Sequence, residues 1–274
     1  MILDGKIVAE KIYNELKNEI LPLEKKPKLG AILIGNNSSS IRYIKQKQKW
    51  AEYIGVDFEL LTFDENISQI SLLEEINKLN IDENISGFII QLPLPKHINE
   101  QEIINSINPE KDVDGFHPIN QGKIVIGDET GLKPCTPAGV IELCKFYNID
   151  LIGKNIVIIG RSNIVGKPLA NMLINMQATL TICNSKTKNI DFYTKNADII
   201  ITAMGSPEFL TTEKINKDTV VIDVGFSVID GKIYGDCDFE NIIQNGNKIT
   251  PVPGGVGALT VAMLMKNTLK AYKK

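Results

Sequence analysis

The sequence contains little of what a metal site, a disulfide framework or a membrane span would need. It has only two histidines, His97 and His117, and no helical His pair, so we do not expect a zinc site. Its four cysteines are widely scattered and include no C-x-x-C pair, which is typical of reduced thiols in a cytoplasmic protein. No apolar run approaches the roughly 20 residues of a membrane-spanning helix. The first residues carry early acids and no continuous apolar core, so no signal peptide is expected.

The chain also lacks a basic excess. Its 30 lysines and arginines stand against 33 acidic residues, which gives a formal net charge of −3 and no support for a nucleic-acid partner. The 274 residues, of which 43% are hydrophobic, can bury a substantial core, and we expect two domains.

Predicted helices and strands alternate along the first half of the chain. Amphipathic segments are followed by short apolar runs, which is typical of βαβ units and a parallel sheet. Lys111–Gly115 and Lys133–Pro137 are expected to be connecting loops. The expected elements of this half are helices at residues 6–21, 39–54 and 68–79 and strands at 29–35, 58–63 and 87–90.

The alternation starts again at Ala138 and indicates a second α/β unit. Its expected elements are a helix to residue 147, strands near residues 155, 179, 198 and 219, and a final amphipathic helix at 259–272.

The most informative segment is a strand that ends in a glycine turn and opens a helix. Ile156–Ile159 shows no polar alternation, which suits a strand covered on both faces. Gly160 allows a sharp turn, and Gly166 allows close approach of the next helix or of a ligand. The helix N-terminus then suits a pyrophosphate. The spacing is not G-x-G-x-x-G, and similar corners occur for packing alone. These residues therefore favour nucleotide binding and leave a packing role open.

The loop after the next strand bears on the choice of nucleotide. In dinucleotide folds a carboxylate at this place binds the ribose hydroxyls, but no acid occurs at residues 179–190. Arg161 from the first turn and Ser185, with Lys186 beside it, would bind a 2′-phosphate instead. A solvated basic loop is the alternative for the lysines. Arg161 and Ser185 together favour NADP over NAD.

One lysine shares the apolar side of the helix predicted at residues 39–54. Spacings of 3, 4, 3 and 4 place five residues on that side: Ser40, Tyr43, Lys47, Trp50 and Ile54. The ordinary interpretation is a lysine that snorkels to solvent. The alternative is a partly desolvated lysine, held by Tyr43, that transfers protons near neutral pH. Tyr-x-x-x-Lys also marks short-chain dehydrogenases, but there the pair follows the nucleotide turn, whereas here it precedes Gly160.

Three further segments contain candidate ligand contacts. Gln91 directly follows a predicted buried strand, where open α/β sheets place ligands, and prolines stiffen the turn after it. Asp114 is a lone carboxylate in a tight loop and suits the N–H/NH2 edge of a pterin. For either residue alone, a turn-capping role is an equally good interpretation. Pro251–Gly257 combines glycines with prolines, so its main chain can approach a flat ligand closely.

Together these segments resemble the bifunctional methylenetetrahydrofolate dehydrogenase/cyclohydrolase family. Six motifs follow the family's order: Ser40-x-x-Tyr43-x-x-x-Lys47, Gln91–Pro95, Asp112–Gly115, Pro134–Pro137, Gly160–Pro168 and Pro251–Gly257. The resemblance implies two α/β domains flanking a cleft, and a homodimer built through the NADP-binding domains. The implied folate-binding catalytic domain covers residues 1–136 and is completed by the C-terminal helix 258–274. The implied Rossmann-like NADP-binding domain covers residues 137–257.

The resemblance also implies roles for individual residues. Lys47 would be the central catalytic residue, with Tyr43 and Gln91 supporting it. The folate would further contact Asp114, which anchors the pterin ring, and Pro253 and Gly254. The residues implied to hold NADP are Gly160, Arg161, Ser162, Ser185 and the main chain of Phe226. Three positions depart from the family's usual residues: Phe226 replaces isoleucine, Ala258 replaces proline, and Asn184 replaces histidine or arginine.

The implied chemistry has two steps. NADP-dependent oxidation converts 5,10-methylenetetrahydrofolate to the methenyl cation, and hydrolysis then yields 10-formyltetrahydrofolate. Oxidation needs orientation and a dry cleft, whereas hydrolysis needs proton transfer, which a lysine such as Lys47 can provide. The alternatives are a dehydrogenase without cyclohydrolase activity, a nucleotide-sensing module without catalysis, and a two-domain dehydrogenase for an amino or hydroxy acid. Lys47 argues against the first alternative, and the last would not require Asp114.

Overall fold

The computed structural model describes residues 1–274 and divides into two compact units. The three-stranded unit comprises Lys11–Cys135 and Val261–Lys274, and the five-stranded unit comprises Met1–Glu10 and Thr136–Thr260. The divisions fall within three helices, α1 (Gly5–Ile20), α6 (Cys135–Phe146) and α10 (Val256–Tyr272). The two-domain α/β fold class expected from the sequence is confirmed.

The start of the chain belongs to the five-stranded unit because its main chain is bonded there. The N–H of Leu3 donates to the carbonyl of Ile249 at 2.8 Å, and the terminal ammonium of Met1 donates to the carbonyl of Asn247 at 2.9 Å. The expected catalytic domain began at residue 1, whereas in the structure the first ten residues group with the other unit.

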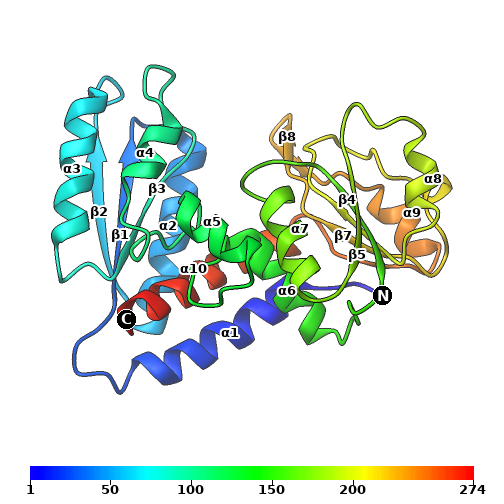
Figure 1. Cartoon of the computed structure of the whole chain (residues 1–274), viewed down its shortest axis with the longest axis horizontal. Helices are drawn as coiled ribbons and strands as arrows, with labels where there is room; N and C mark the ends of the chain where they lie inside the picture. The colour runs from blue at the N-terminus through cyan, green and yellow to red at the C-terminus, as the bar shows by residue number, and fades with distance from the viewer. The chain divides into compact units, whose positions relative to one another are not determined.

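The three-stranded unit is built on a parallel sheet in the order β2-β1-β3. The strands are β1 (Lys28–Ile34), β2 (Asp57–Phe63) and β3 (Gly87–Ile90), as the alternating pattern predicted. Helices α2 (Ser38–Ile54) and α3 (Gln69–Ile81) connect them and lie on opposite sides of the sheet (Figure 1). Two short helices were not predicted, α4 (Glu100–Ser106) and α5 (Pro118–Val125), because seven or eight residues give little periodicity to recognise.

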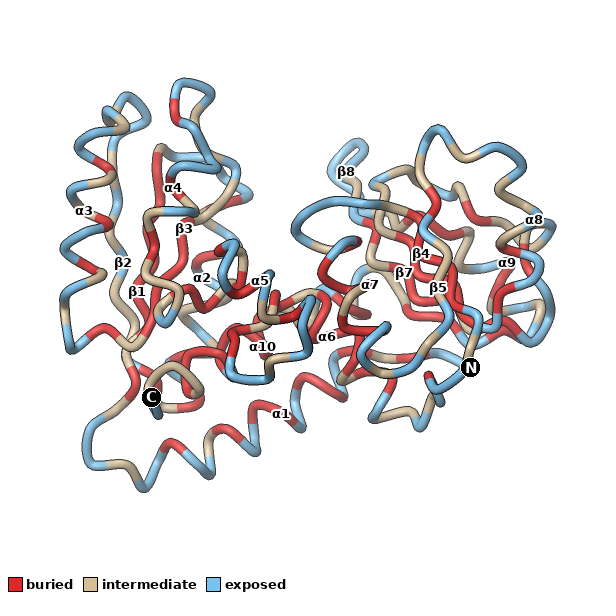
Figure 2. Tube along the Cα trace, in the orientation of Figure 1, coloured by how far each residue is buried: buried red, intermediate tan, exposed pale blue.

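Apolar side chains from β1, β3, α3 and α4 form the main core of this unit. The buried cluster includes Ile32, Ile76, Phe88 and Ile103. Figure 2 shows the corresponding contrast between the buried strands β1 and β3 and helix α3, whose outer turns are exposed. The sheet is thus a rigid support for residues at the carboxyl ends of its strands.

The five-stranded unit has a parallel sheet in the order β10-β7-β6-β4-β5. The chain passes from β4 to β5 on one side and returns to β6 on the other side of β4, so the topological switch point lies between β4 and β6. Helix α7 (Gly166–Asn175) lies on one side of the sheet, and α8 (Ile190–Thr194) and α9 (Phe239–Gln244) lie on the other (Figure 1). The strands are β4 (Asn155–Ile159), β5 (Thr179–Cys183), β6 (Ile199–Thr202), β7 (Val220–Asp223) and β10 (Lys248–Ile249).

Several elements of this unit differ from the expectation, among them α8, α9 and β10, which were not predicted. Cys135–Pro137 is not a loop but the first turn of α6, where proline is tolerated because the first N–H groups have no helical acceptor. An unpredicted hairpin, β8 (Ser227–Ile229) and β9 (Lys232–Tyr234), follows β7. Its turn residues, Asp230 and Gly231, both have positive φ, as tight hairpin turns require. The remaining short element is a 3₁₀ turn at Thr212–Lys214. None of the helices is both long and apolar enough to cross a bilayer.

Candidate active site

Helix α2 presents Lys47 on its buried face. The helix begins at an Asn37 cap, whose side-chain oxygen accepts from the N–H groups of Ser39 and Ser40, and it ends at the left-handed Gly55. Its buried residues are Ser40, Ile44, Ala51 and Ile54, and Lys47 continues the same 3–4 spacing. Ser40, Lys47 and Ile54 lie on this face as predicted, but Ile44 and Ala51 lie there in place of Tyr43 and Trp50. Tyr43 lies at the flank with 41% of its surface exposed.

The ammonium of Lys47 is tied to the end of β3. Its Nζ donates a 2.9 Å hydrogen bond to Oε1 of Gln91. Gln91 is itself held, because its Nε2 donates to the carbonyl of Leu92 at 2.8 Å and its N–H donates to the carbonyl of Ile32 at 2.9 Å. Both ends of the Gln91 amide therefore have partners, and its oxygen is directed at the ammonium. The structure thus brings two predicted site residues from different elements into direct contact.

Asp114 belongs to the same cluster. The residue as a whole is half-buried; burial of its carboxyl group raises the pKa of that group, while the positive charge of Lys47 acts in the opposite direction. The positive charge of Lys47 thus acts on the carboxyl group of Asp114. A small hollow beside Asp114 is lined mainly by apolar side chains, among them Phe88, Leu92 and Phe116. A carboxylate at an apolar hollow suits a flat ligand with a polar edge.

Asp112 shapes the loop that carries Asp114. It is buried, and its two oxygens accept hydrogen bonds from the N–H groups of Gly115, Phe116 and His117, at 3.1, 3.2 and 2.8 Å, and from Nδ2 of Asn120 at 2.9 Å. Burial raises the pKa of Asp112 to about 6, and these donors oppose the shift. No role was predicted for Asp112, although two acids that flank a valine before a glycine offered a signal.

Cys135 is a second residue whose place in the site was missed. Its buried Sγ donates to the carbonyl of Val113 at 3.4 Å. Burial raises the pKa of this thiol well above its usual range, the charge of Asp114 raises it further, and Lys47 opposes the shift. The thiol is therefore protonated at neutral pH and lies close to both charged residues. The motif Pro134–Pro137 was noticed, but its cysteine could not be placed beside Asp114 without the fold.

A second group of predicted residues lies at the carboxyl edge of the five-stranded sheet. Gly160 follows β4 with a φ of +132°, and a Cβ built there would lie 2.3 Å from the carbonyl oxygen of Ala203. A Cβ on Gly166 would lie 2.3 Å from the carbonyl oxygen of Gly160. Both positions therefore admit only glycine. The close main-chain approach falls at the topological switch point and at the N-terminus of α7, where a pyrophosphate fits.

The loops that carry Arg161 and Ser185 are neighbours. Strands β4 and β5 pair in register to their carboxyl ends, with Ile159 opposite Cys183, and the N–H of Gly160 donates to the carbonyl of Cys183 at 2.9 Å. Both Arg161 and Ser185 are exposed just beyond that point. The arrangement leaves them free to meet a phosphate group on the ligand.

The remaining predicted cofactor and substrate residues occupy loops of the five-stranded unit. Ser162 lies in the turn before α7, where its Oγ accepts from the N–H of Val165 at 3.1 Å. Phe226 is 48% exposed in the loop between β7 and the β8–β9 hairpin. Gly254 has a φ of +109°, and its carbonyl accepts from the N–H of Gly5 at 2.9 Å, which holds the Pro253–Gly254 turn in place.

Two buried carboxylates organise the loops at this sheet edge. Asp223 accepts from the N–H groups of Gly225 and Cys237 at 2.8 and 2.9 Å, and Asp236 accepts from the N–H groups of Met204 and Ser206, both at 2.7 Å. Burial raises the pKa of Asp223. The loops after β6 and β7 are thereby pinned to each other, a role that the sequence analysis missed.

The tetrahydrofolate dehydrogenase/cyclohydrolase family matches the chain in both of its domains. Its catalytic domain matches residues 3–114, and its NAD(P)-binding domain matches residues 134–274. This chain belongs to the tetrahydrofolate dehydrogenase/cyclohydrolase family. The family predicted from the six motifs is confirmed, and so is its pair of activities, a dehydrogenase and a cyclohydrolase.

Individual members of the family are similar over the whole length. The Bifunctional protein FolD of Sulfurihydrogenibium sp. is 48% identical and covers 100% of this chain and 98% of the relative. The crystal structure of the bifunctional enzyme FolD from Campylobacter jejuni is 47% identical, with a TM-score of 0.98 and coverage of 100% and 98%. The Trypanosoma brucei enzyme, solved with NADP and an inhibitor, is 35% identical, with a TM-score of 0.93 and coverage of 100% and 97%.

Proposed function

We propose that this chain oxidises 5,10-methylenetetrahydrofolate with NADP and hydrolyses the methenyl product to 10-formyltetrahydrofolate, with Lys47, Gln91 and Asp114 at the folate. The observation that carries the proposal is the contact between Lys47 and Gln91 beside the carboxylate of Asp114. A nucleotide-sensing module would not need this cluster, and a dehydrogenase for a hydroxy acid would not need Asp114.

Lys47 is the proton carrier of the hydrolysis. Water adds to the methenyl carbon, and the bond from that carbon to N5 of the folate breaks, which leaves the formyl group on N10. One proton of the water ends on N5 and the other is released. The ammonium of Lys47 donates a proton to N5 as that bond breaks, and the resulting amine recovers a proton from the hydroxyl group on the former methenyl carbon. Gln91 keeps Nζ in position through its 2.9 Å hydrogen bond, and Tyr43, at the flank of the same helix, contacts the folate ring.

Asp114 anchors the pterin ring. Its carboxylate accepts two hydrogen bonds from the N–H/NH2 edge of the ring. Pro253 and Gly254 contribute main-chain contacts to the substrate, because the glycine conformation permits a close approach.

NADP is the cofactor, and it supplies the acceptor for the hydride of the first step. The Trypanosoma brucei relative was solved with NADP. In this chain Gly160 admits the pyrophosphate, Ser162 lies at the N-terminus of α7, and Arg161 and Ser185 bind the 2′-phosphate. The exposed Phe226 offers its main chain to the nicotinamide end.

The activity is tested with the purified chain and two folate substrates. Absorbance at the NADPH wavelength follows oxidation of methylenetetrahydrofolate with NADP or NAD, and loss of methenyl absorbance follows hydrolysis. We expect both reactions, with NADP preferred. Oxidation without enzymatic hydrolysis would support the dehydrogenase-only alternative, and failure of both reactions would contradict the proposal.

We further propose that the enzyme is a cytoplasmic homodimer formed through the five-stranded units. The β8–β9 hairpin exposes Val228, Ile229 and Ile233, an apolar surface suited to a second copy. The four cysteines are buried and unpaired, which suits a reducing compartment. Light scattering of the wild type and of Val228→Lys tests the dimer. We expect a dimer for the first and a monomer for the second.

A further inference from the structure

The last helix holds the loop that carries Asp114. Asn267 of α10 is buried, and its Nδ2 donates to the main-chain oxygens of Val113 and Lys133, both at 2.8 Å. A side-chain amide has two N–H hydrogens, so both are engaged. Val113 directly precedes Asp114. One side chain thus joins the Asp114 loop to the segment that leads into α6.

Cys135 and Gly115 bring the Asp114 loop and the segment before α6 into close contact. The carbonyl of Val113 also accepts from the thiol of Cys135, which lies 3.7 Å from Nδ2 of Asn267. Gly115 has a φ of +76°, and a Cβ built there would lie 2.5 Å from the main-chain nitrogen of Pro134. The two loops therefore touch main chain to main chain, and the amide of Asn267 bridges them from the helix.

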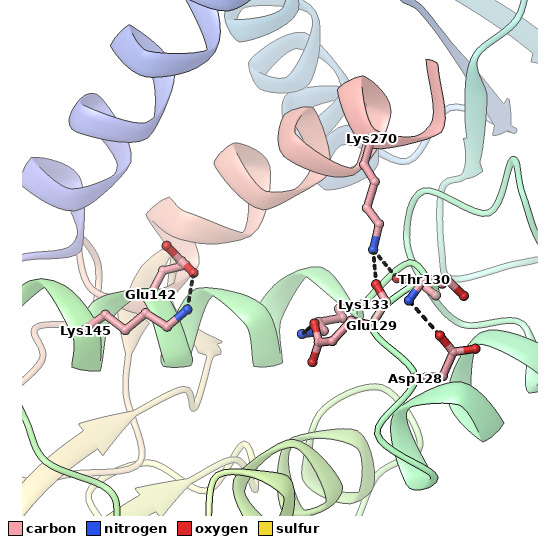
Figure 3. A network of polar contacts seen from close by, with 8 residues as sticks. Asp128, Glu129, Thr130, Lys133, Glu142, Lys145 and Lys270 are labelled. Atoms are coloured by element: carbon pink, nitrogen blue, oxygen red, sulfur yellow. Dashed lines mark hydrogen bonds and ion pairs between the residues drawn. The ribbon is translucent and has the colours of Figure 1, made fainter. Parts of the chain in front are cut away.

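Lys270 makes a comparable but separate attachment one turn further along α10. Its Nζ donates to the carbonyls of Glu129 and Gly131, at 2.7 and 2.6 Å, and Figure 3 shows it reaching from the helix toward this turn. Both lysine contacts hold the segment before Lys133 and do not reach the Asp114 loop. Lys270 is therefore a natural control for Asn267.

We propose that Asn267 is a positioning residue of the folate site, which sets the place of the Asp114 carboxylate by holding the carbonyl of Val113. The proposal rests on the role of Asp114 proposed above. Without the amide, the carbonyls of Val113 and Lys133 lose a shared donor in a buried place, and the loop moves to find other partners. A carboxylate that must accept two hydrogen bonds from one edge of a ring tolerates little displacement.

The test compares Asn267→Leu, which fills the same space without donors, with Lys270→Met and with Asp114→Asn. We expect Asn267→Leu to raise the KM for methylenetetrahydrofolate about tenfold and to leave the Kd for NADP unchanged. We expect Lys270→Met to lower the Tm and to keep the wild-type KM for the folate. In the double variant Asn267→Leu/Asp114→Asn the KM should equal that of Asp114→Asn alone, because Asn267 acts through Asp114. Asn267→Ser, which keeps one hydroxyl donor, serves if the leucine variant does not fold.

The outcomes separate this inference from the proposed function. If Asp114→Asn binds folate as the wild type does, the role of Asp114 is wrong. If Asp114→Asn raises the KM for the folate and Asn267→Leu raises it by a further factor in the double variant, Asn267 does not act through Asp114. The inference is then overturned. A wild-type KM in folded Asn267→Leu or Asn267→Ser would overturn it as well, as would an equal rise in KM for Lys270→Met.

Discussion

Lys47 and Gln91 form a 2.9 Å hydrogen bond between a helix face and the end of a strand. The lysine lies in line with the buried residues of α2, where an ammonium needs a polar partner, and the oxygen of Gln91 provides one. The same bond places the charged group at the carboxyl edge of the sheet, beside Asp114. A polar group on an apolar face is thus explained by its position in the candidate site.

Replacing Lys47 should separate the two reactions. Lys47→Met keeps most of the stem volume and the helix propensity but removes the amine. Hydrolysis needs the proton carrier, and a positioned acid or base contributes about 10²–10⁴-fold, so we expect nearly all cyclohydrolase activity to be lost. A larger fraction of dehydrogenase activity should remain. Both rates are measured on one preparation.

Lys45→Met is the matched control for this change, because Lys45 lies on the exposed side of α2. Circular dichroism verifies that both variants fold. Hydrolysis near the wild-type rate in Lys47→Met would mean that Lys47 is only a snorkelling lysine.

Asp114→Asn should weaken folate binding and leave NADP binding intact. The change keeps the size of the side chain but replaces one acceptor oxygen with a donor, which cannot accept from the N–H/NH2 edge of a pterin. We expect both activities to fall, since both use the same folate. Calorimetric titration with tetrahydrofolate measures the loss. Asp128→Asn, at a half-buried position after α5, is the control. Equal affinities of the two variants for tetrahydrofolate would mean that Asp114 only caps its turn.

Arg161→Ala should weaken NADP more than NAD. A charge-assisted contact to the 2′-phosphate contributes about 1.5–3 kcal/mol, or roughly one to two decades of affinity, and NAD has no such phosphate. The Kd values of both cofactors are measured by titration. Lys217→Ala, which removes a charge at the amino-terminal edge of the same sheet, should change neither value much. An equal loss for both cofactors would contradict the phosphate assignment.

Asp112 should make the stability of the protein depend on pH. Its folded pKa of about 6 lies above the ordinary value of about 3.9, so the folded state binds the proton more tightly than the unfolded state. The protonated carboxyl group of Asp112 therefore makes its full contribution to the free energy of unfolding below about pH 4. It falls by up to about 3 kcal/mol as the pH rises to about 6.

Denaturant unfolding of the wild type and of Asp112→Ala at pH 4.5 and pH 7 measures how the contribution of Asp112 to the free energy of unfolding depends on pH. The alanine variant lacks the titration, so the advantage of the wild type should be larger at the lower pH. The variant should also be less stable at both values, because the N–H groups of Gly115, Phe116 and His117 lose their acceptor. An advantage that grows with pH would show that the carboxylate form is the favoured one.

The sequence by itself determined the repeating βα elements and the chemistry of the motifs. Hydrophobic periodicity and glycine turns are local, so the strand at Ile156–Ile159 and the turn at Gly160 could be predicted from adjacent residues. The family's six motifs predicted Lys47 and Asp114 as site residues before any contact was known. Local pattern failed for the short α4 and α5 and for the first turn of α6, where few residues define the period.

Only the tertiary structure decided which polar groups serve the site and which hold it together. Asn267 and Val113 are separated by 154 positions, and nothing local to either residue predicts that an amide of the last helix bonds the carbonyl before Asp114. The buried carboxylate of Asp236 likewise binds the main-chain N–H groups of Met204 and Ser206, in a loop that comes to it only when the chain folds. A buried polar group must find its partners wherever packing brings them, so its role depends on the whole fold rather than on its neighbours in sequence.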